Sequence, residues 1–134
     1  MSITVRRDAG RDGLRHSVQI RNHVIDIDAS PAAGGEDAGP EPHDLYDAAL
    51  GACKALTLLV YAKRKGIPVD DIEVTIARDD SGERQGVYKL MASLRVTGDL
   101  SDAQRDELMR VAGKCPVHKL MTEVSTEIET VWAA

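Results

Sequence analysis

Apolar and polar positions alternate in three short runs at the start of the chain. Such alternation places the apolar side chains on one face of an extended strand. Residues 21–23 separate the second and third runs and predict a tight turn, with Asn22 able to take a positive φ. These runs predict an antiparallel meander with its apolar face at Ile3, Val5, Leu14, Val18, Ile20, Ile25 and Ile27.

Residues 30–42 contain three prolines and three glycines, which forbid regular structure. A loop this long in a compact domain is either a linker or part of a functional site. A chain of 134 residues is too short for two ordinary domains. We therefore expect a single domain over residues 1–134 and a functional role for the loop.

The next segment predicts a helix over residues 43–65 that is apolar on nearly every side. Pro42 and Asp44 suit its first turn, and residues 63–65 put three positive charges at its last turn before Gly66. A helix that is apolar all round is buried all round. One chain has too little sheet and helix to cover it, so we expect a homodimer with the two central helices packed together.

The second half of the chain predicts two strands around a polar loop, two helices and a last strand. The segments are strands over 72–76 and 88–96, a helix from the near capping box at 101–104 to Gly113, a short helix from Pro116, and a strand marked by Val124, Ile128 and Trp132. Runs of strands interrupted by a long helix indicate the α+β class.

Charge and composition exclude several classes of function. The net charge is −5, whereas nucleic acid binding needs a positive face, and no basic run is present to hold anionic lipid. The amino terminus lacks the apolar core of a signal peptide, and no unbroken run of about 18 apolar residues suggests a membrane span. We therefore expect a cytoplasmic protein that binds neither nucleic acid nor membrane.

Two cysteines are too few for a disulfide framework in a cytosolic protein, and three alternatives stay open: inert core thiols, a metal pair or a redox pair. Cys53 lies in the middle of the predicted long helix, where a small buried hydrophobe is the simplest interpretation. Gly51 and Ala52, however, remove bulk beside the thiol and permit close approach of a substrate or another chain. Lys54 adds a cation, which we expect on a different face of the helix.

Cys115 precedes Pro116, which makes it the predicted N-cap of the short helix. Unpaired N–H groups at that end favour a thiolate, and Lys114 and His118 add positive charge. A chance cysteine at a turn is the alternative interpretation. Cys115 and His118 also have the spacing of half a zinc site, but two ligands of four, without a second motif, lead us to expect no metal.

With these residues in view, the chain resembles the OsmC/Ohr family of osmotically induced and organic hydroperoxide resistance proteins over almost its whole length. Residues 39–53 resemble the family's signature, in which Pro, an acidic residue and Leu precede small residues that end in the reactive cysteine. Residues 114–119 resemble the segment of the second cysteine, which is followed by Pro. The Ala-Ala-Leu-Gly-Ala-Cys form is closer to the OsmC-like subgroup. The resemblance implies an α+β fold, an intertwined homodimer whose antiparallel sheets flank long buried central helices.

The resemblance also implies thiol peroxidase chemistry on small organic hydroperoxides. Cys53 would attack the peroxide and become a sulfenic acid, which Cys115 would condense to a disulfide. An external dithiol, for example of the lipoyl type, would reduce the disulfide, and no cofactor is implied. Arg11, in the turn over residues 10–13, matches the family arginine that steadies the thiolate, and Asp44 matches the acidic residue that orients this arginine.

One position departs from the peroxide-resistance branch, because His43 stands where that branch has a glutamate. Asp44 would lie about 13 Å from Cys53 on an ideal helix and about half a turn out of phase, so it would act through Arg11. Two alternatives therefore stay open beside the peroxidase. One is a non-catalytic OsmC-like stress or ligand-binding protein, and the other is a thiol–disulfide redox protein.

Overall fold

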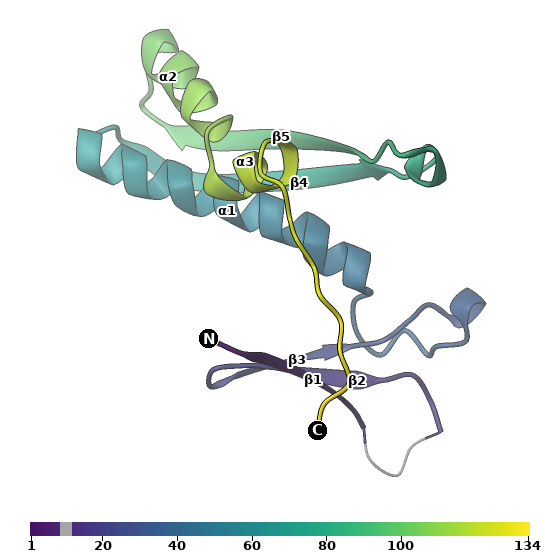
Figure 1. Cartoon of the computed structure of the whole chain (residues 1–134). Coiled ribbons are helices and arrows are strands. Elements are labelled where there is room, and N and C mark those ends of the chain that lie inside the picture. The colour runs from purple at the N-terminus through teal and green to yellow at the C-terminus, as the bar shows by residue number, and fades with distance from the viewer. Residues whose placement is uncertain (9–11) are drawn as a thin grey trace. The chain divides into compact units, whose positions relative to one another are not determined.

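The computed structural model describes residues 1–8 and 12–134, which form two compact units, residues 1–47 and residues 48–134. Unit 1 holds strands β1 (Ile3–Arg7), β2 (His16–Ile20) and β3 (His23–Ile27), the short 3-10 helix η1 (Pro31–Ala33) and the start of helix α1 (Pro42–Lys65). Unit 2 holds the rest of α1, strand β4 (Val69–Asp79), η2 (Glu83–Gln85), strand β5 (Lys89–Gly98), and helices α2 (Asp102–Ala112) and α3 (Pro116–Thr122) (Figure 1). This mixture of helices and antiparallel sheets confirms the α+β class.

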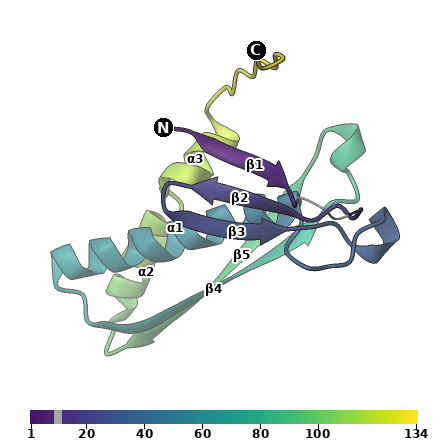
Figure 2. The same cartoon turned by 90° about the horizontal axis from the view of Figure 1, so that it is seen from below.

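Unit 1 contains the predicted meander, with strand order β1-β2-β3 (Figure 2). Ile20 pairs with His23, so the turn between β2 and β3 holds only two residues. The predicted turn is present, and the residue in it with a positive φ, 53°, is Arg21 and not Asn22. A positive φ at the first of two turn residues still gives a backbone twist that matches the flanking strands.

The loop that follows β3 is irregular, as predicted, and a buried carboxylate organises it. Asp28 accepts backbone N–H bonds from Ala29 at 2.8 Å and from Glu36 and Ala38 at 3.1 Å each. These amides, Ala38 first, hold the pKa of Asp28 below its ordinary value of 3.8. The backbone closes tightly here, since a Cβ on Gly35 would lie 2.1 Å from the carbonyl oxygen of Ala29.

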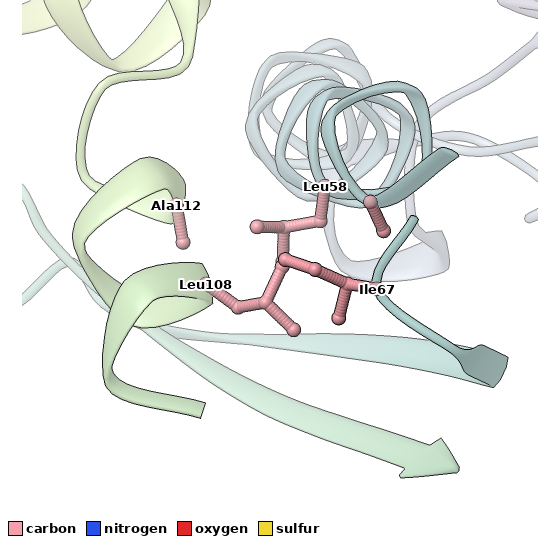
Figure 3. Packing of buried hydrophobic residues seen from close by; sticks show 5 residues of the cluster. Leu58, Ile67, Leu108 and Ala112 are labelled. Atoms are coloured by element: carbon pink, nitrogen blue, oxygen red, sulfur yellow. The ribbon is translucent and has the colours of Figure 1, made fainter. Parts of the chain in front are cut away.

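Unit 2 is built on an apolar core between α1, α2 and the β4–β5 hairpin. Its most buried members come from α1, from the short segment between α1 and β4, and from α2: Leu58, Ala62, Ile67, Leu108 and Ala112 (Figure 3). Half-buried side chains on one face of the hairpin pack against this cluster. Helix α1 lies close to β4 at Gly51, where an added Cβ would be 3.1 Å from the Ile76 side chain.

Only one side of α1 is buried within a single chain. Leu50, Leu58 and Ala62 are less than a tenth exposed, whereas Leu56 is 64% exposed and Val60 50%. The sheet and helices of unit 2 cover a single stripe of α1, which agrees with the expectation that one chain has too little sheet and helix to bury this helix all round. The homodimer stays a prediction.

By length and apolar content alone, α1 would be able to cross a membrane. The absence of an unbroken run of about 18 apolar residues therefore does not by itself exclude a membrane span, as we had expected it to. The core helix of a soluble protein passes the same test, and the buried stripe of α1 contributes Leu58 and Ala62 to the core of unit 2.

The predicted last strand is absent from the described chain. Residues 123–134 follow α3 without regular structure (Figure 1). Ile128 is 83% exposed and Trp132 99% exposed. A strand exists through hydrogen bonds to a neighbouring strand, and no described strand pairs with this segment.

Candidate thiol site

Cys53 lies near the middle of α1 in unit 2, and the residue is half-buried. The backbone N–H of Val117, in the first turn of α3, donates a hydrogen bond to this sulfur at 3.5 Å. The hydroxyl of Thr57, one turn further along α1, lies 3.9 Å from the sulfur. The local environment of the thiol is therefore made by α1 itself and by the start of α3.

Cys115 is the N-cap of α3, with φ −63° and ψ 143°, as predicted. Its own side chain makes no capping bond, and it is completely buried. The N–H of Val117, which an N-cap side chain could have accepted, is directed to the Cys53 sulfur instead. Two residues of chain span at most about 7 Å, so the segment that carries Cys115 lies beside Cys53. Both cysteines are free thiols.

Lys54 is a site residue whose burial the sequence did not predict. It is only 5% exposed, and its ammonium group donates to the carbonyl oxygen of Ala112 at 2.7 Å. The same nitrogen lies 2.9 Å from Nδ1 of His118. The missed signal was the spacing of Leu50, Lys54 and Leu58, since residues four apart share one helix face.

The remaining candidates belong to unit 1 or lie outside the described residues. Arg11 is outside them. Asp44 is in the first turn of α1, where its carboxylate accepts the backbone N–H of Glu41 at 2.9 Å, as in half of a capping box. Asp44 is nine positions before Cys53 on α1, and the two residues fall in different units.

No group of three or more His, Cys, Asp or Glu side chains arranged to hold a metal ion occurs among residues 1–8 and 12–134. His118 uses Nδ1 toward Lys54. The half zinc site suggested by the spacing of Cys115 and His118 therefore gains no further ligands within this part of the chain.

Fold and site together define a small α+β protein with a half-exposed thiol on a long central helix and a second, buried thiol at the start of a neighbouring helix. The family model described as OsmC-like protein matches residues 34–130, and the chain belongs to this family. The matched range begins in unit 1 and covers nearly all of unit 2. A comparison with curated proteins found no match.

Three of the solved structures similar to this chain carry OsmC or organic hydroperoxide resistance names. An OsmC-like protein from Mycoplasma pneumoniae is 19% identical with a TM-score of 0.72, over 92% of this chain and 87% of that one. An organic hydroperoxide resistance protein OsmC from Legionella pneumophila is 20% identical with a TM-score of 0.63, over 92% and 90%. The organic hydroperoxide resistance protein OhrB of Bacillus subtilis is 28% identical with a TM-score of 0.57, over 91% and 90%. These similarities confirm the predicted α+β fold of a single chain.

Proposed function

We propose that this protein reduces organic hydroperoxides, with Cys53 as the attacking thiol and Cys115 as the resolving thiol. The observation that carries the proposal is the hydrogen bond from the Val117 N–H to the Cys53 sulfur, because it brings the segment of the second cysteine to the first. An N–H directed at a sulfur favours its thiolate form, which is the nucleophile. Two of the similar structures are named as organic hydroperoxide resistance proteins, which supports the same substrate class.

The proposed reaction has three balanced steps. The Cys53 thiolate attacks one oxygen of the peroxide, the O–O bond breaks, and the alkoxide leaves and takes a proton to become an alcohol. The Cys53 sulfenic acid then condenses with the Cys115 thiol to give a disulfide and water. An external dithiol, of the lipoyl type for example, reduces the disulfide by exchange and is itself oxidised. No bound cofactor takes part in these steps.

The exposure of the two thiols fits this division of roles. Cys53 is half-buried and Cys115 is fully buried, so a reagent from solvent meets Cys53 first. The condensation requires Cys115 to turn toward Cys53, with Cα atoms within about 7 Å. In this proposal Arg11 stabilises the thiolate and the departing oxygen, and Asp44 orients Arg11.

We further propose that the active form is a homodimer in which a second copy covers the open side of α1. Apolar side chains on that side are exposed in one chain, for example Leu56 and Val60. The exposed Trp132 in the tail is a second candidate for the interface. Sedimentation is expected to give a dimer for the wild type and a monomer for Leu56→Asp. A folded wild-type monomer at micromolar concentration would contradict this.

Consumption of cumene hydroperoxide with a dithiol reductant tests the proposed activity. Cys53→Ser should abolish turnover, and Cys115→Ser assayed without the dithiol should consume one equivalent of peroxide per chain and form no disulfide within the chain. Peptide mapping of the oxidised wild type should find a disulfide between residues 53 and 115. If Cys53→Ser consumes peroxide as fast as the wild type, the proposal is wrong.

A thiol–disulfide redox protein without efficient peroxide turnover is the second candidate. His43 favours it, because this residue stands where the peroxide-resistance branch has a glutamate. The bond from the Glu41 N–H to Asp44 favours it too, because this bond already engages one oxygen of the carboxylate proposed to orient Arg11. The Legionella protein is also described as a regulator of sulfide bond formation. In the same assay this candidate predicts rapid disulfide exchange with dithiols and no peroxide consumption above the free thiol rate.

A further inference from the structure

We infer that Lys54 is a positioning residue for the Cys53 thiol: its ammonium group fixes the α2–α3 connection and thereby holds the Val117 N–H on the sulfur. The inference rests on the proposed function only in taking Cys53 as the reacting thiol. The contacts of Lys54 inside unit 2 support this role.

A lysine that is 5% exposed loses most of its hydration, which is costly unless its N–H groups find acceptors. Lys54 donates to the carbonyl oxygen of Ala112 at 2.7 Å and lies 2.9 Å from Nδ1 of His118. An ammonium group has no lone pair, so Nδ1 is the acceptor in the second contact. A non-polar side chain would fill the same position without this cost, which indicates a specific role for the two bonds.

The two acceptors lie on opposite sides of the short connection between α2 and α3. Ala112 is the last residue of α2, where the final carbonyls of a helix lack intrahelical partners and a cation is favoured. His118 is in the first turn of α3. Because one nitrogen bonds to both, it fixes the end of α2 relative to the start of α3, and Cys115 lies between them.

The same arrangement acts directly on the thiol. Cys53 and Lys54 are consecutive on α1, and their partners Val117 and His118 are consecutive on α3. The N–H to sulfur distance of 3.5 Å leaves little tolerance for a shift of α3. A movement that lengthened the Lys54 to His118 contact would also withdraw the Val117 N–H from the sulfur.

The test measures alkylation of Cys53 by iodoacetamide against pH, with Cys115→Ser in every protein so that one thiol reports. Lys54→Met removes both bonds and is expected to slow the alkylation of Cys53 by about threefold to tenfold at a fixed pH, because the Val117 N–H is no longer held on the sulfur. Lys114→Met is the matched control, because it removes an equal charge from an exposed lysine in the same connection. Its profile is expected to coincide with that of the parent protein.

A second variant separates positioning from charge and covers the case in which Lys54→Met does not fold. His118→Leu keeps the ammonium group and its bond to Ala112 but removes the acceptor on α3. Positioning predicts the same slowing of Cys53 alkylation in His118→Leu. If its profile coincides with that of the parent, or if a folded Lys54→Met does so, the inference is wrong.

Alkylation needs no peroxide, so this test is independent of the proposed activity. A wild type that fails to consume hydroperoxide would overturn the peroxidase while the two profiles still decide the role of Lys54. A wild type that turns over, together with unmoved profiles, would leave the peroxidase in place and remove Lys54 from its machinery.

Discussion

Each of the two units of this chain is stabilised internally by a different kind of interaction. Among the described residues of unit 1, Val18 is the one apolar side chain less than a tenth exposed, and the loop after β3 is organised by the Asp28 carboxylate. Unit 2 has a cluster of buried apolar residues around Leu58. Non-directional burial supplies most of the stability of a domain, whereas directional polar bonds fix a particular conformation. The thiols lie in unit 2, where the core gives them a rigid support.

The largest expected effect is loss of the unit 2 core. Leu108→Ala should lower the free energy of unfolding by about 2–5 kcal/mol, because Leu108 is 3% exposed and its removal leaves a cavity. The neighbouring Met109 is 61% exposed, and Met109→Ala should change the free energy of unfolding by less than about 0.5 kcal/mol. Urea unfolding measures both variants. Equal losses would mean that apolar burial does not distinguish the two positions.

In the tight loop of unit 1, added side-chain volume should lower the free energy of unfolding, whereas in the core of unit 2 the loss of apolar burial does so. Gly35→Ala places a Cβ 2.1 Å from the Ala29 carbonyl oxygen, so backbone must shift, and we expect a loss of about 1–3 kcal/mol. Gly113→Ala is the control in unit 2, since Gly113 has a helical φ of −71° and the nearest atom lies 3.5 Å away. Amide hydrogen exchange should show the Gly35→Ala effect in the loop over residues 28–41. An unchanged loop would show that its backbone is not tightly closed.

The Ser101 cap in unit 2 indicates how much one polar hydrogen bond contributes to the free energy of unfolding, for comparison with the polar bonds of unit 1. Ser101 caps α2 by accepting the Gln104 N–H, and the Gln104 side chain accepts the Ser101 N–H in return. Ser101→Ala should cost about 1 kcal/mol in urea unfolding. Ser101→Asn, which keeps a capping oxygen, should recover most of that loss. A cost near zero would mean that the capping box adds nothing to the apolar core.

The smallest expected effect is a change with pH in the contribution of Asp28 to the free energy of unfolding, and it appears only at acidic pH. Asp28 has a lowered pKa, so its bonds to the amides of Ala38, Ala29 and Glu36 stabilise the folded state fully above its ordinary value of 3.8. That stabilisation is lost as the pH falls through the lower value of the folded state. The stability gap between wild type and Asp28→Asn should therefore narrow below about pH 3.8. Asp37→Asn, at an exposed position of the same loop, should show no such change, and a gap independent of pH would contradict the role of Asp28.

Local sequence patterns determined most of the elements. Helix α1 begins at Pro42 and ends before Gly66, α3 begins at Pro116, and both strands of the β4–β5 hairpin lie where the alternation predicted them. These features depend on residues within one or two turns of each other, which a sequence displays directly. The two thiols were identified in the same way, from their immediate neighbours.

Tertiary structure alone decided how these pieces meet. Whether α1 buries one stripe or all of its faces, whether the 124–132 segment finds a strand to pair with, and which sulfur receives the Val117 N–H all depend on segments distant in sequence. Lys54 shows the reason, because its charge predicts exposure and only the carbonyl of Ala112, 58 positions away, makes its burial possible. A buried polar group is stable where the fold brings an acceptor to it, and that acceptor is fixed by packing and not by the residues beside it in the chain.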